Sequence, residues 1–153
     1  MADVLTPEQR RLNMSRIRGC NTRPEMIIRR GLHALGFRYR LHDKTLTGRP
    51  DLVFSRYRAV IFVHGCFWHG HNCSLFKLPA TRQDFWKKKI TSNCVRDTRS
   101  AEALIERGWR VATVWECSLR GHKKIGTDGV IKECRSFLLS CEVERIDIRG
   151  SIA

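Results

Sequence analysis

The sequence predicts an α/β fold in which a mixed sheet is covered by helices. The first observation behind this prediction is a short apolar segment, Leu52–Phe54, which a polar turn separates from a β-branched run, Arg58–Val63. Such a pair is typical of two adjacent antiparallel strands. The second observation is the order of the other segments, because helical patterns flank these strands and a further strand pattern, Trp109–Trp115, follows a long helical stretch. Together they indicate one sheet with helices packed against it.

Two helix starts precede these strands. The segments TPEQ (6–9) and TRPE (22–25) both have the form of a helix N-cap, with Thr followed three residues later by Gln or Glu. The first helix would run to about Arg18 and has a thin apolar face, so it is either a peripheral solvated helix or an arm that contacts a partner. The second helix would stop at Gly36, and capping alone is enough to explain Glu25 at its start.

The remaining elements follow from local patterns. Alternating apolar and basic residues predict a strand at Phe37–Leu41, which a polar connection, His42–Thr47, follows. Helical spacing predicts a helix at about Arg82–Arg107, in one or two pieces, and a weaker helix at Ile125–Leu139. We expect Glu142–Ala153 to be a tail.

A carboxylate and a histidine are expected at one edge of the sheet. Asp51 stands where the first strand begins and His64 where its partner ends, and antiparallel pairing brings these two ends together. Pro50 suits the first residue of a strand, because it has no N–H to donate to a ladder. Since Mg²⁺ binds through one or two carboxylates and keeps several waters, this edge is compatible with a metal-dependent phosphodiesterase.

Cysteine and histidine residues cluster after the second strand. Cys66, His71 and Cys73 are closely spaced, and Cys117 follows the Trp109–Trp115 strand. A Cys3His set suits tetrahedral zinc, which would pin this loop to the end of the later strand. The alternative is a group of unconnected buried cysteines and a surface histidine. Seven cysteines without a secretory leader pattern do not indicate a disulfide framework. The cysteines expected to be ordinary thiols in a reducing cytoplasm are Cys20, Cys94, Cys134 and Cys141.

The charge of the chain predicts a polyanionic partner. There are 29 Lys and Arg against 15 Asp and Glu, which gives a net charge of +14. Nucleic acid is the first candidate for this partner and a membrane surface the second. No apolar run reaches the length of a transmembrane helix. A chain of 153 residues is expected to form one domain with a substantial core.

Two motifs closely resemble a known family. The segments GRPD (48–51) and HGCFWHGHNC (64–73) are similar to those of the very-short-patch repair (Vsr) endonucleases of bacteria. The resemblance covers almost the whole chain up to about residue 121. The further segments that carry it are LFKLPATR (75–82), FW (85–86), WRVATVWEC (109–117) and LRG (119–121).

The resemblance implies a restriction-endonuclease-like fold, a variant of the PD-(D/E)xK nucleases. It implies a single nuclease domain over residues 1–153, with a DNA-clamping arm at about 1–20. Pro50-Asp51 matches the first half of the PD-(D/E)xK motif, whereas Phe62-Val63-His64 stands where an acid, any residue and lysine are found in the wider superfamily. This departure removes one metal-binding carboxylate, so the backbone carbonyl of Val63 is the implied replacement ligand.

The resemblance also assigns catalytic roles. Asp51 would be the central magnesium ligand. His69 would position or deprotonate the attacking water, and Asp97, which from its pattern alone is only a surface carboxylate, would orient that imidazole. Glu25 and His64 would hold metal-bound waters.

Further residues would bind zinc and DNA. The structural Zn²⁺ ligands implied by the resemblance are Cys66, His71, Cys73 and Cys117. The aromatic side chains that would wedge between base pairs are Phe67, Trp68 and Trp86. From the opposite groove the arm would clamp the duplex with Met14 and Ile17.

The activity implied by the resemblance is Mg²⁺-dependent nicking of one strand of double-stranded DNA, 5′ of the thymine in a T:G mismatch. This nick would initiate very-short-patch repair of deaminated 5-methylcytosine. The resemblance further implies a monomer in the bacterial cytoplasm, associated with nucleoid DNA and not with a membrane. It implies functional association with a cytosine-5 DNA methyltransferase and contacts with mismatch-repair proteins. Two alternatives stay open: a zinc-stabilised DNA-binding module without cleavage, and a restriction enzyme of the same fold that cuts intact duplex.

Overall fold

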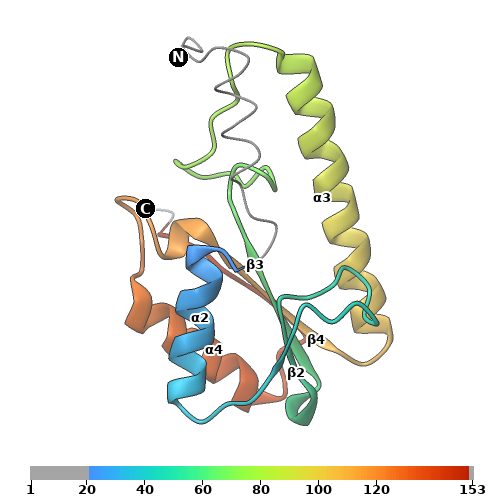
Figure 1. Cartoon of the computed structure of the whole chain (residues 1–153), viewed down its shortest axis with the longest axis vertical. Helices are drawn as coiled ribbons and strands as arrows, with labels where there is room; N and C mark the ends of the chain where they lie inside the picture. Colours follow the sequence, from blue (N-terminus) through green and yellow to red (C-terminus); the bar gives the residue numbers. More distant parts are fainter. Residues whose placement is uncertain (1–20, 152–153) are drawn as a thin grey trace.

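A computed structural model describes residues 21–151 of the chain (Figure 1). The helices within this range are α2 (Arg23–Ala34), α3 (Gln83–Glu106) and α4 (Thr127–Ser140). The strands are β1 (Arg40–Leu41), β2 (Leu52–Phe54), β3 (Ala59–His64), β4 (Arg110–Trp115) and β5 (Arg145–Ile148). The expected arm at residues 1–20, with Met14 and Ile17, lies outside the described residues.

The strands form one mixed sheet in the order β1-β2-β3-β4-β5. The pairs β1–β2 and β2–β3 are antiparallel, whereas β3–β4 and β4–β5 are parallel. Parallel neighbours require a crossover connection, and α3 and α4 supply the two that this order needs. The predicted α/β fold with a mixed sheet is therefore confirmed.

Helices cover both faces of this sheet (Figure 1). Alternate residues of a strand point to opposite faces, so each strand contributes to two cores. Helices α2 and α4 pack on one face, over a buried cluster that includes Leu52, Phe54 and Ile61. Helix α3 packs on the other face, over a smaller cluster that includes Val53 and Val60. Figure 1 shows the first turns of α3 extending past the end of the sheet, beside the loop that follows β3.

The strand expected at Phe37–Leu41 is mostly wrong, because only Arg40 and Leu41 pair with β2. The apolar side chains of this segment pack against the core, although most of its backbone does not pair with a strand. The ring of Phe37 lies 6.3 Å from that of Phe54. The Tyr39 hydroxyl donates to the carbonyl of Arg29 in α2 at 2.9 Å.

The C-terminal segment differs most from its prediction. The tail expected at Glu142–Ala153 contains β5, which lies at the edge of the sheet beside β4. Its sequence, RIDI, alternates polar and apolar residues, and Ile148 is buried against the α2–α4 side. The alternation was a strand signal, although only four residues long. The long helical stretch near Arg82–Arg107 forms one continuous helix, α3.

Candidate active site

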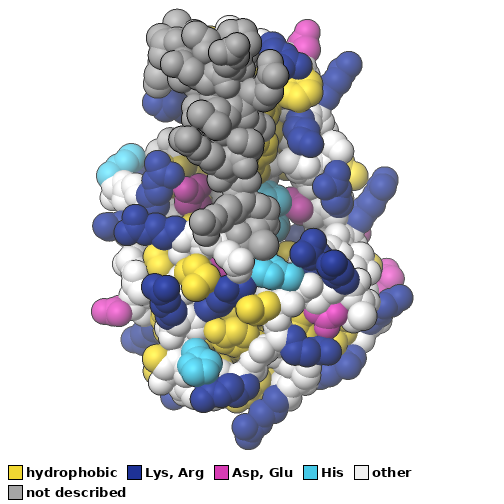
Figure 2. Space-filling model, viewed as in Figure 1, with side chains coloured by type: hydrophobic (Ala, Val, Ile, Leu, Met, Phe, Trp, Pro, Cys, Tyr) yellow, Lys and Arg dark blue, Asp and Glu magenta, His cyan; other side chains and the backbone are white. Residues whose placement is uncertain are grey.

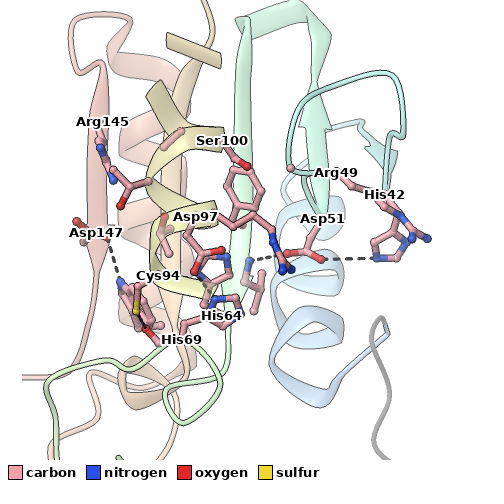
Figure 3. A pocket seen from close by; sticks show the side chains of 18 residues that line it. His42, Arg49, Asp51, His64, His69, Cys94, Asp97, Ser100, Arg145 and Asp147 are labelled. Atoms are coloured by element: carbon pink, nitrogen blue, oxygen red, sulfur yellow. Dashed lines mark hydrogen bonds and ion pairs between the residues drawn. The ribbon is translucent and has the colours of Figure 1, made fainter. Parts of the chain in front are cut away.

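A cavity of about 470 Å³ lies between α3 and the sheet (Figure 3). Its floor consists of side chains of β3, β4 and β5 that face α3, and its wall comes from the middle of α3. Asp51, at the start of β2, lies at one end of the cavity, and Arg145 of β5 also lines it. Most of the charged and imidazole side chains predicted to act in catalysis therefore lie around one space.

Asp51 is fixed against the end of β3. Its Oδ2 accepts a hydrogen bond from the backbone N–H of Val63 at 2.7 Å. In a strand the N–H and C=O of one residue point to the same side, so the carbonyl of Val63 faces the side on which Asp51 lies. Continued by two residues, the register that pairs Leu52 with Ile61 would place Pro50 opposite Val63. Proline has no N–H to give that carbonyl, which leaves it free to bind another group.

Asp51 lies in an environment that disfavours its charge. The pKa of Asp51 is raised to about 7, mainly by burial and also by the negative charge of Glu25, against the opposing effect of the hydrogen bond from the Val63 N–H. Two carboxylates that share a buried site repel each other unless a proton or a cation lies between them. The oxygen-rich donor set and this repulsion fit a divalent cation at Asp51.

Glu25 is held in a way that its capping role does not explain. Thr22 caps α2 by accepting the N–H of Glu25 at 3.4 Å, as expected. The carboxylate of Glu25 is buried, with 2% of the side chain exposed, and its Oε2 contacts Arg29 Nη2 at 2.8 Å and His42 Nε2 at 2.9 Å. His42 also lies 3.8 Å from Asp51 Oδ1 (Figure 3). Sequence reasoning missed His42, because a single histidine in a polar connection carries no spacing signal.

The predicted pairing of His69 with Asp97 is present in the structure. His69 Nδ1 donates to Asp97 Oδ2 at 2.5 Å. An ionised carboxylate can only accept, so the proton lies on Nδ1 and the lone pair of Nε2 is available as a base. Asp97 comes from α3, so the crossover helix positions this histidine.

His64 stacks on His69, with ring centroids 3.7 Å apart and planes 3° from parallel. Burial, followed by the charge of His69, lowers the pKa of His64 to about 3, so the His64 ring is neutral near pH 7. Its Nδ1 is buried without a hydrogen-bond partner in the described part of the chain. A buried polar atom of this kind usually has a partner, and a water held at the cavity would supply one.

Two α3 residues that the sequence did not suggest hold the loop after β3. Asn93 Nδ2 donates to the carbonyl of Trp68 at 2.8 Å. The thiol of Cys94 donates to the carbonyl of His69 at 3.1 Å. Two successive backbone carbonyls of the loop, those of Trp68 and His69, are thus tied to α3. Neither residue type has a pattern that would have revealed this role.

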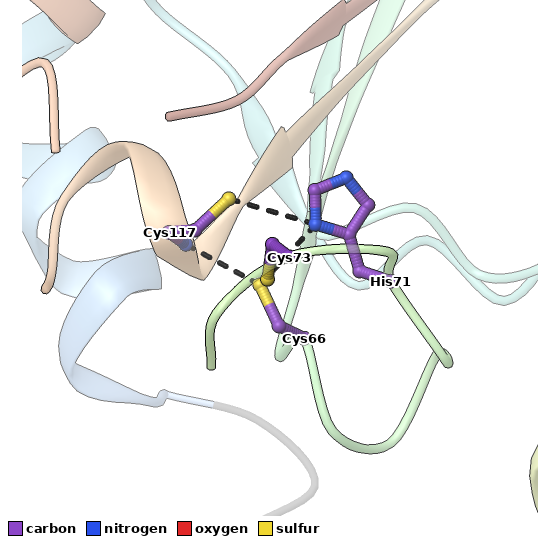
Figure 4. Close-up of side chains that lie close together, drawn as sticks. All are labelled: Cys66, His71, Cys73 and Cys117. Carbon is purple, nitrogen blue, oxygen red and sulfur yellow. Dashed lines mark hydrogen bonds between the residues drawn. The ribbon is translucent and has the colours of Figure 1, made fainter. Parts of the chain in front are cut away.

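A second group of side chains could hold a metal ion (Figure 4). Its members are Cys66, His71, Cys73 and Cys117, whose ligand atoms all lie within 4.8 Å of one another. His71 Nδ1 is 3.6 Å from Cys66 Sγ and 3.5 Å from Cys117 Sγ. Tetrahedral bonds of ~2.3 Å to sulfur and ~2.0 Å to nitrogen would require a separation of ~3.5 Å. Burial raises the pKa of the Cys66 and Cys117 thiols, so a cation that displaces their protons would be needed to ionise them.

Backbone groups complete this Cys/His cluster. The N–H of Cys117 donates to Cys66 Sγ at 3.3 Å, and the N–H of Gly150 donates to Cys117 Sγ at 3.3 Å. The His71 ring stacks on Trp115 with centroids 4.0 Å apart. All six cysteines in the described range are free, as expected in the absence of a disulfide framework. The alternative of unconnected cysteines is not compatible with this convergence.

The three predicted aromatic residues also come together. Trp86 of α3 lies 5.4 Å from Phe67 and 5.8 Å from Trp68, measured between ring centroids, and the two loop residues are 5.1 Å apart. All three side chains are only partly buried. The loop and the start of α3 therefore present one aromatic cluster.

The sheet edge with carboxylates and an oriented imidazole is typical of metal-dependent hydrolases. The sequence profile of the family described as "DNA mismatch endonuclease Vsr" matches residues 2–75. The "Type II nicking enzyme V.XorIIP" of Xanthomonas oryzae pv. oryzae is 54% identical over 119 residues, which cover 78% of this chain and 88% of that protein. The "DNA mismatch endonuclease Vsr" of Escherichia coli K12 is 49% identical over 133 residues, or 87% of this chain and 85% of that protein. The "Type II nicking enzyme V.NmeAIP" of Neisseria meningitidis is 44% identical over 120 residues, or 78% and 86%.

The chain therefore belongs to the Vsr family of DNA mismatch endonucleases. It is a nuclease, and hence a hydrolase. Membership of this family implies an endonuclease-like fold, with which the mixed sheet agrees. Among the described helices, none is long and apolar enough to cross a membrane.

The pKa of Asp51 predicts a pH-dependent stability. The pKa is about 7 in the folded protein against an ordinary 3.8, so the carboxyl contributes stability below pH 4 that is lost as the pH rises to 7. We compare the free energy of unfolding of Asp51→Asn with that of wild type, without added divalent ions. The variant's advantage over wild type should be larger at pH 8 than at pH 5 by roughly 2 kcal/mol. Urea unfolding at both pH values measures this difference. An equal difference at both would show that Asp51 titrates normally.

Proposed function

We propose that this chain is a Mg²⁺-dependent endonuclease that nicks one strand of DNA 5′ of the thymine in a T:G mismatch and so initiates very-short-patch repair of deaminated 5-methylcytosine. The observation that carries the proposal is the position of Asp51 against Val63, in the same cavity as the His69–Asp97 pair. Support for the reaction comes from relatives that are named as a mismatch endonuclease and as nicking enzymes.

The same observation supports a restriction-endonuclease-like fold of the PD-(D/E)xK type. The proline of the motif would leave the carbonyl of Val63 without a ladder donor, and the aspartate binds the N–H of that residue. In this chain the carbonyl would take the place of the missing second carboxylate. The arrangement accounts for the absence of an acid at Phe62 without loss of a metal site.

Asp51 and the Val63 carbonyl would hold the magnesium ion, and Glu25 and His64 would hold its waters. The bound ion would stabilise negative charge on the attacked phosphate and on the leaving oxygen. His69 would accept the proton of the attacking water at Nε2, because Asp97 keeps the other ring nitrogen protonated. The neutral His64 ring beneath it adds no repulsion when His69 becomes charged.

We also propose that the Cys/His cluster holds Zn²⁺. Four protein ligands close a tetrahedral site, so the ion would have no open position for substrate and would act on the shape of the protein. It would join the loop after β3 to the end of β4 and to Gly150. The aromatic cluster and His69 lie on this loop, so their positions would depend on the ion.

The proposed substrate is double-stranded DNA with a T:G mismatch. Figure 2 shows many Lys and Arg side chains on the described part of the visible face, in keeping with the net charge of +14. Phe67, Trp68 and Trp86 would insert beside the mismatch, where unstacking costs less than in paired duplex. Met14 and Ile17, outside the described residues, stay predicted contacts of the opposite groove.

Cellular associations stay predictions of the family resemblance. They are a functional link to a cytosine-5 DNA methyltransferase, contacts with mismatch-repair proteins, monomeric action and a place in the bacterial cytoplasm near nucleoid DNA.

Strand-specific nicking tests the proposed reaction. A labelled T:G duplex with randomised flanking bases should be nicked 5′ of the thymine with Mg²⁺, whereas a T:A duplex and a sample with EDTA should not. Asp51→Asn should lower the rate by roughly 1,000-fold or more while DNA binding is kept, because several kcal/mol of charge stabilisation would be lost. Cleavage of the T:A duplex would favour a restriction enzyme, and binding without cleavage in any context would favour an inactive DNA-binding module.

The aromatic cluster predicts a selective loss. We expect the double variant Phe67→Ala/Trp68→Ala to lose at least about tenfold in the ratio of T:G to T:A affinity, since stacking is worth ~1–3 kcal/mol per base. Affinity for T:A duplex should change much less. Phe85→Ala, which removes a more exposed ring beside the cluster, is the matched control. Equal losses for both duplexes, together with a lowered melting temperature, would assign these rings to folding.

The Cys/His cluster predicts bound zinc. The purified protein should contain about one zinc ion per chain by atomic emission. Cys73→Ser should lose it and unfold at a lower temperature, because metal binding contributes directly to folding. Cys141→Ser, at an exposed thiol outside the cluster, should keep the metal. Absence of zinc from wild-type protein purified without chelators would refute the assignment.

A further inference from the structure

A histidine stands directly beside the two carboxylates of the proposed cation site. His42 immediately follows β1, and its N–H donates to the carbonyl of Asp51 at 3.2 Å. The β1–β2 register, which pairs Arg40 with Val53 and Leu41 with Leu52, continues to place His42 opposite Asp51. The backbone of His42 thus lies beside Asp51, and its imidazole reaches both carboxylates.

We propose that His42 is a ligand of the catalytic cation and that it raises the affinity of this site for a transition-metal ion such as Mn²⁺ relative to its affinity for Mg²⁺. This inference rests on the proposed function, in that Asp51 is taken as a ligand of the same ion. His42 and Asp51 would bind this ion directly, and Glu25 would hold one of its waters. The ligand atoms of Glu25, His42 and Asp51 lie within 4.8 Å of one another.

The distances suit a shared ion. His42 Nε2 is 2.9 Å from Glu25 Oε2 and 3.8 Å from Asp51 Oδ1. In an octahedron with bonds of ~2.1 Å, adjacent ligand atoms are ~3.0 Å apart and opposite ones ~4.2 Å. A small shift of either side chain would therefore place His42 Nε2 and Asp51 Oδ1 on one ion, with the Val63 carbonyl on the side that Asp51 faces and Glu25 beside a metal-bound water.

Burial favours a site-specific role for His42. Only 15% of its side chain is exposed, against 2% for Glu25 and 16% for Asp51. Arg29 binds Glu25 Oε2 from the side of α2, so it would keep this carboxylate in place.

The donor type determines the metal preference. Carboxylates, carbonyls and water suit Mg²⁺ and Mn²⁺ alike, whereas an imidazole nitrogen adds affinity for transition-metal ions and little for Mg²⁺. A site with one nitrogen among oxygens should bind Mn²⁺ more tightly than an all-oxygen site of the same shape, with little gain for Mg²⁺. His42 would then be a specificity-determining residue for the ion, and its Nε2 would exchange the contact with Glu25 for the ion when the ion binds.

Mn²⁺ binding to the full-length, zinc-loaded protein tests this inference without a reaction. Electron paramagnetic resonance measures the concentration of free Mn²⁺ and so gives the Mn²⁺ Kd, and displacement of bound Mn²⁺ by Mg²⁺ gives the Mg²⁺ Kd. Pulsed electron paramagnetic resonance detects ¹⁴N that is bound directly to Mn²⁺. We expect His42→Gln, whose amide can still donate to Glu25, to raise the Mn²⁺ Kd about tenfold and the Mg²⁺ Kd less than about threefold. The directly bound ¹⁴N signal should disappear. His33→Gln, at an exposed histidine near the other end of α2, is the matched control.

The outcomes separate this inference from the proposed function. Asp51→Asn should abolish Mn²⁺ binding at this site. If it does not, the proposed metal site is wrong, and the inference is wrong with it. Two results would overturn only the inference while Asp51→Asn still abolishes Mn²⁺ binding. One is a wild-type protein without a directly bound ¹⁴N signal, and the other is a His42→Gln variant that keeps this signal and has an unchanged Mn²⁺ affinity. In either case His42 serves as a hydrogen-bond donor to Glu25.

Discussion

The active site depends on the register between β2 and β3. That register brings Asp51 to the N–H of Val63 and would place Pro50, which cannot donate, across from the carbonyl of the same residue. A slip by one residue would turn every side chain of β2 to the other face of the sheet. The buried residues Leu52 and Phe54 on one face and Val53 on the other would then exchange cores, so burial on both sides keeps the register fixed.

Helix α3 links this strand pair to the loop that carries the other functional groups. Over 24 residues it covers one face of the sheet with its C-terminal half and extends past the sheet with its N-terminal half. Its extended half supplies Trp86 to the aromatic cluster, and its middle supplies Asn93, Cys94 and Asp97 to the loop. A crossover that two parallel strands require thus also orients the imidazole of His69.

Features that depend on residues near one another in the sequence could be predicted, whereas those that depend on residues far apart in the sequence could not. The β2–β3 pair and the meeting of Asp51 with the end of β3 could be predicted, because a β-branched run and a short turn are local signals. Strand β5 was missed because four alternating residues are a weak signal, and its pairing with β4 is a long-range contact. The partnership of His69 with Asp97 joins residues 28 positions apart, so only the family resemblance suggested it. His42 was missed for the same reason, since its role depends on the pairing of β1 with β2.

The two proposed metal sites lie close together and are distinguished by donor type. Trp115 connects them: its ring stacks on His71 of the Cys/His cluster and meets His64 edge to face at 5.3 Å. Its Nε1–H is bound to Asp147 of β5 at 3.0 Å, which fixes the indole between the sites. Thiolates favour Zn²⁺, whereas carboxylates favour Mg²⁺ or Mn²⁺. When Zn²⁺ is scarce, the Cys/His cluster would therefore take it, and the carboxylate site would bind Mg²⁺ or Mn²⁺. The imidazole of His42 would make the two sites less different, because it would raise the affinity of the carboxylate site for Zn²⁺ as well.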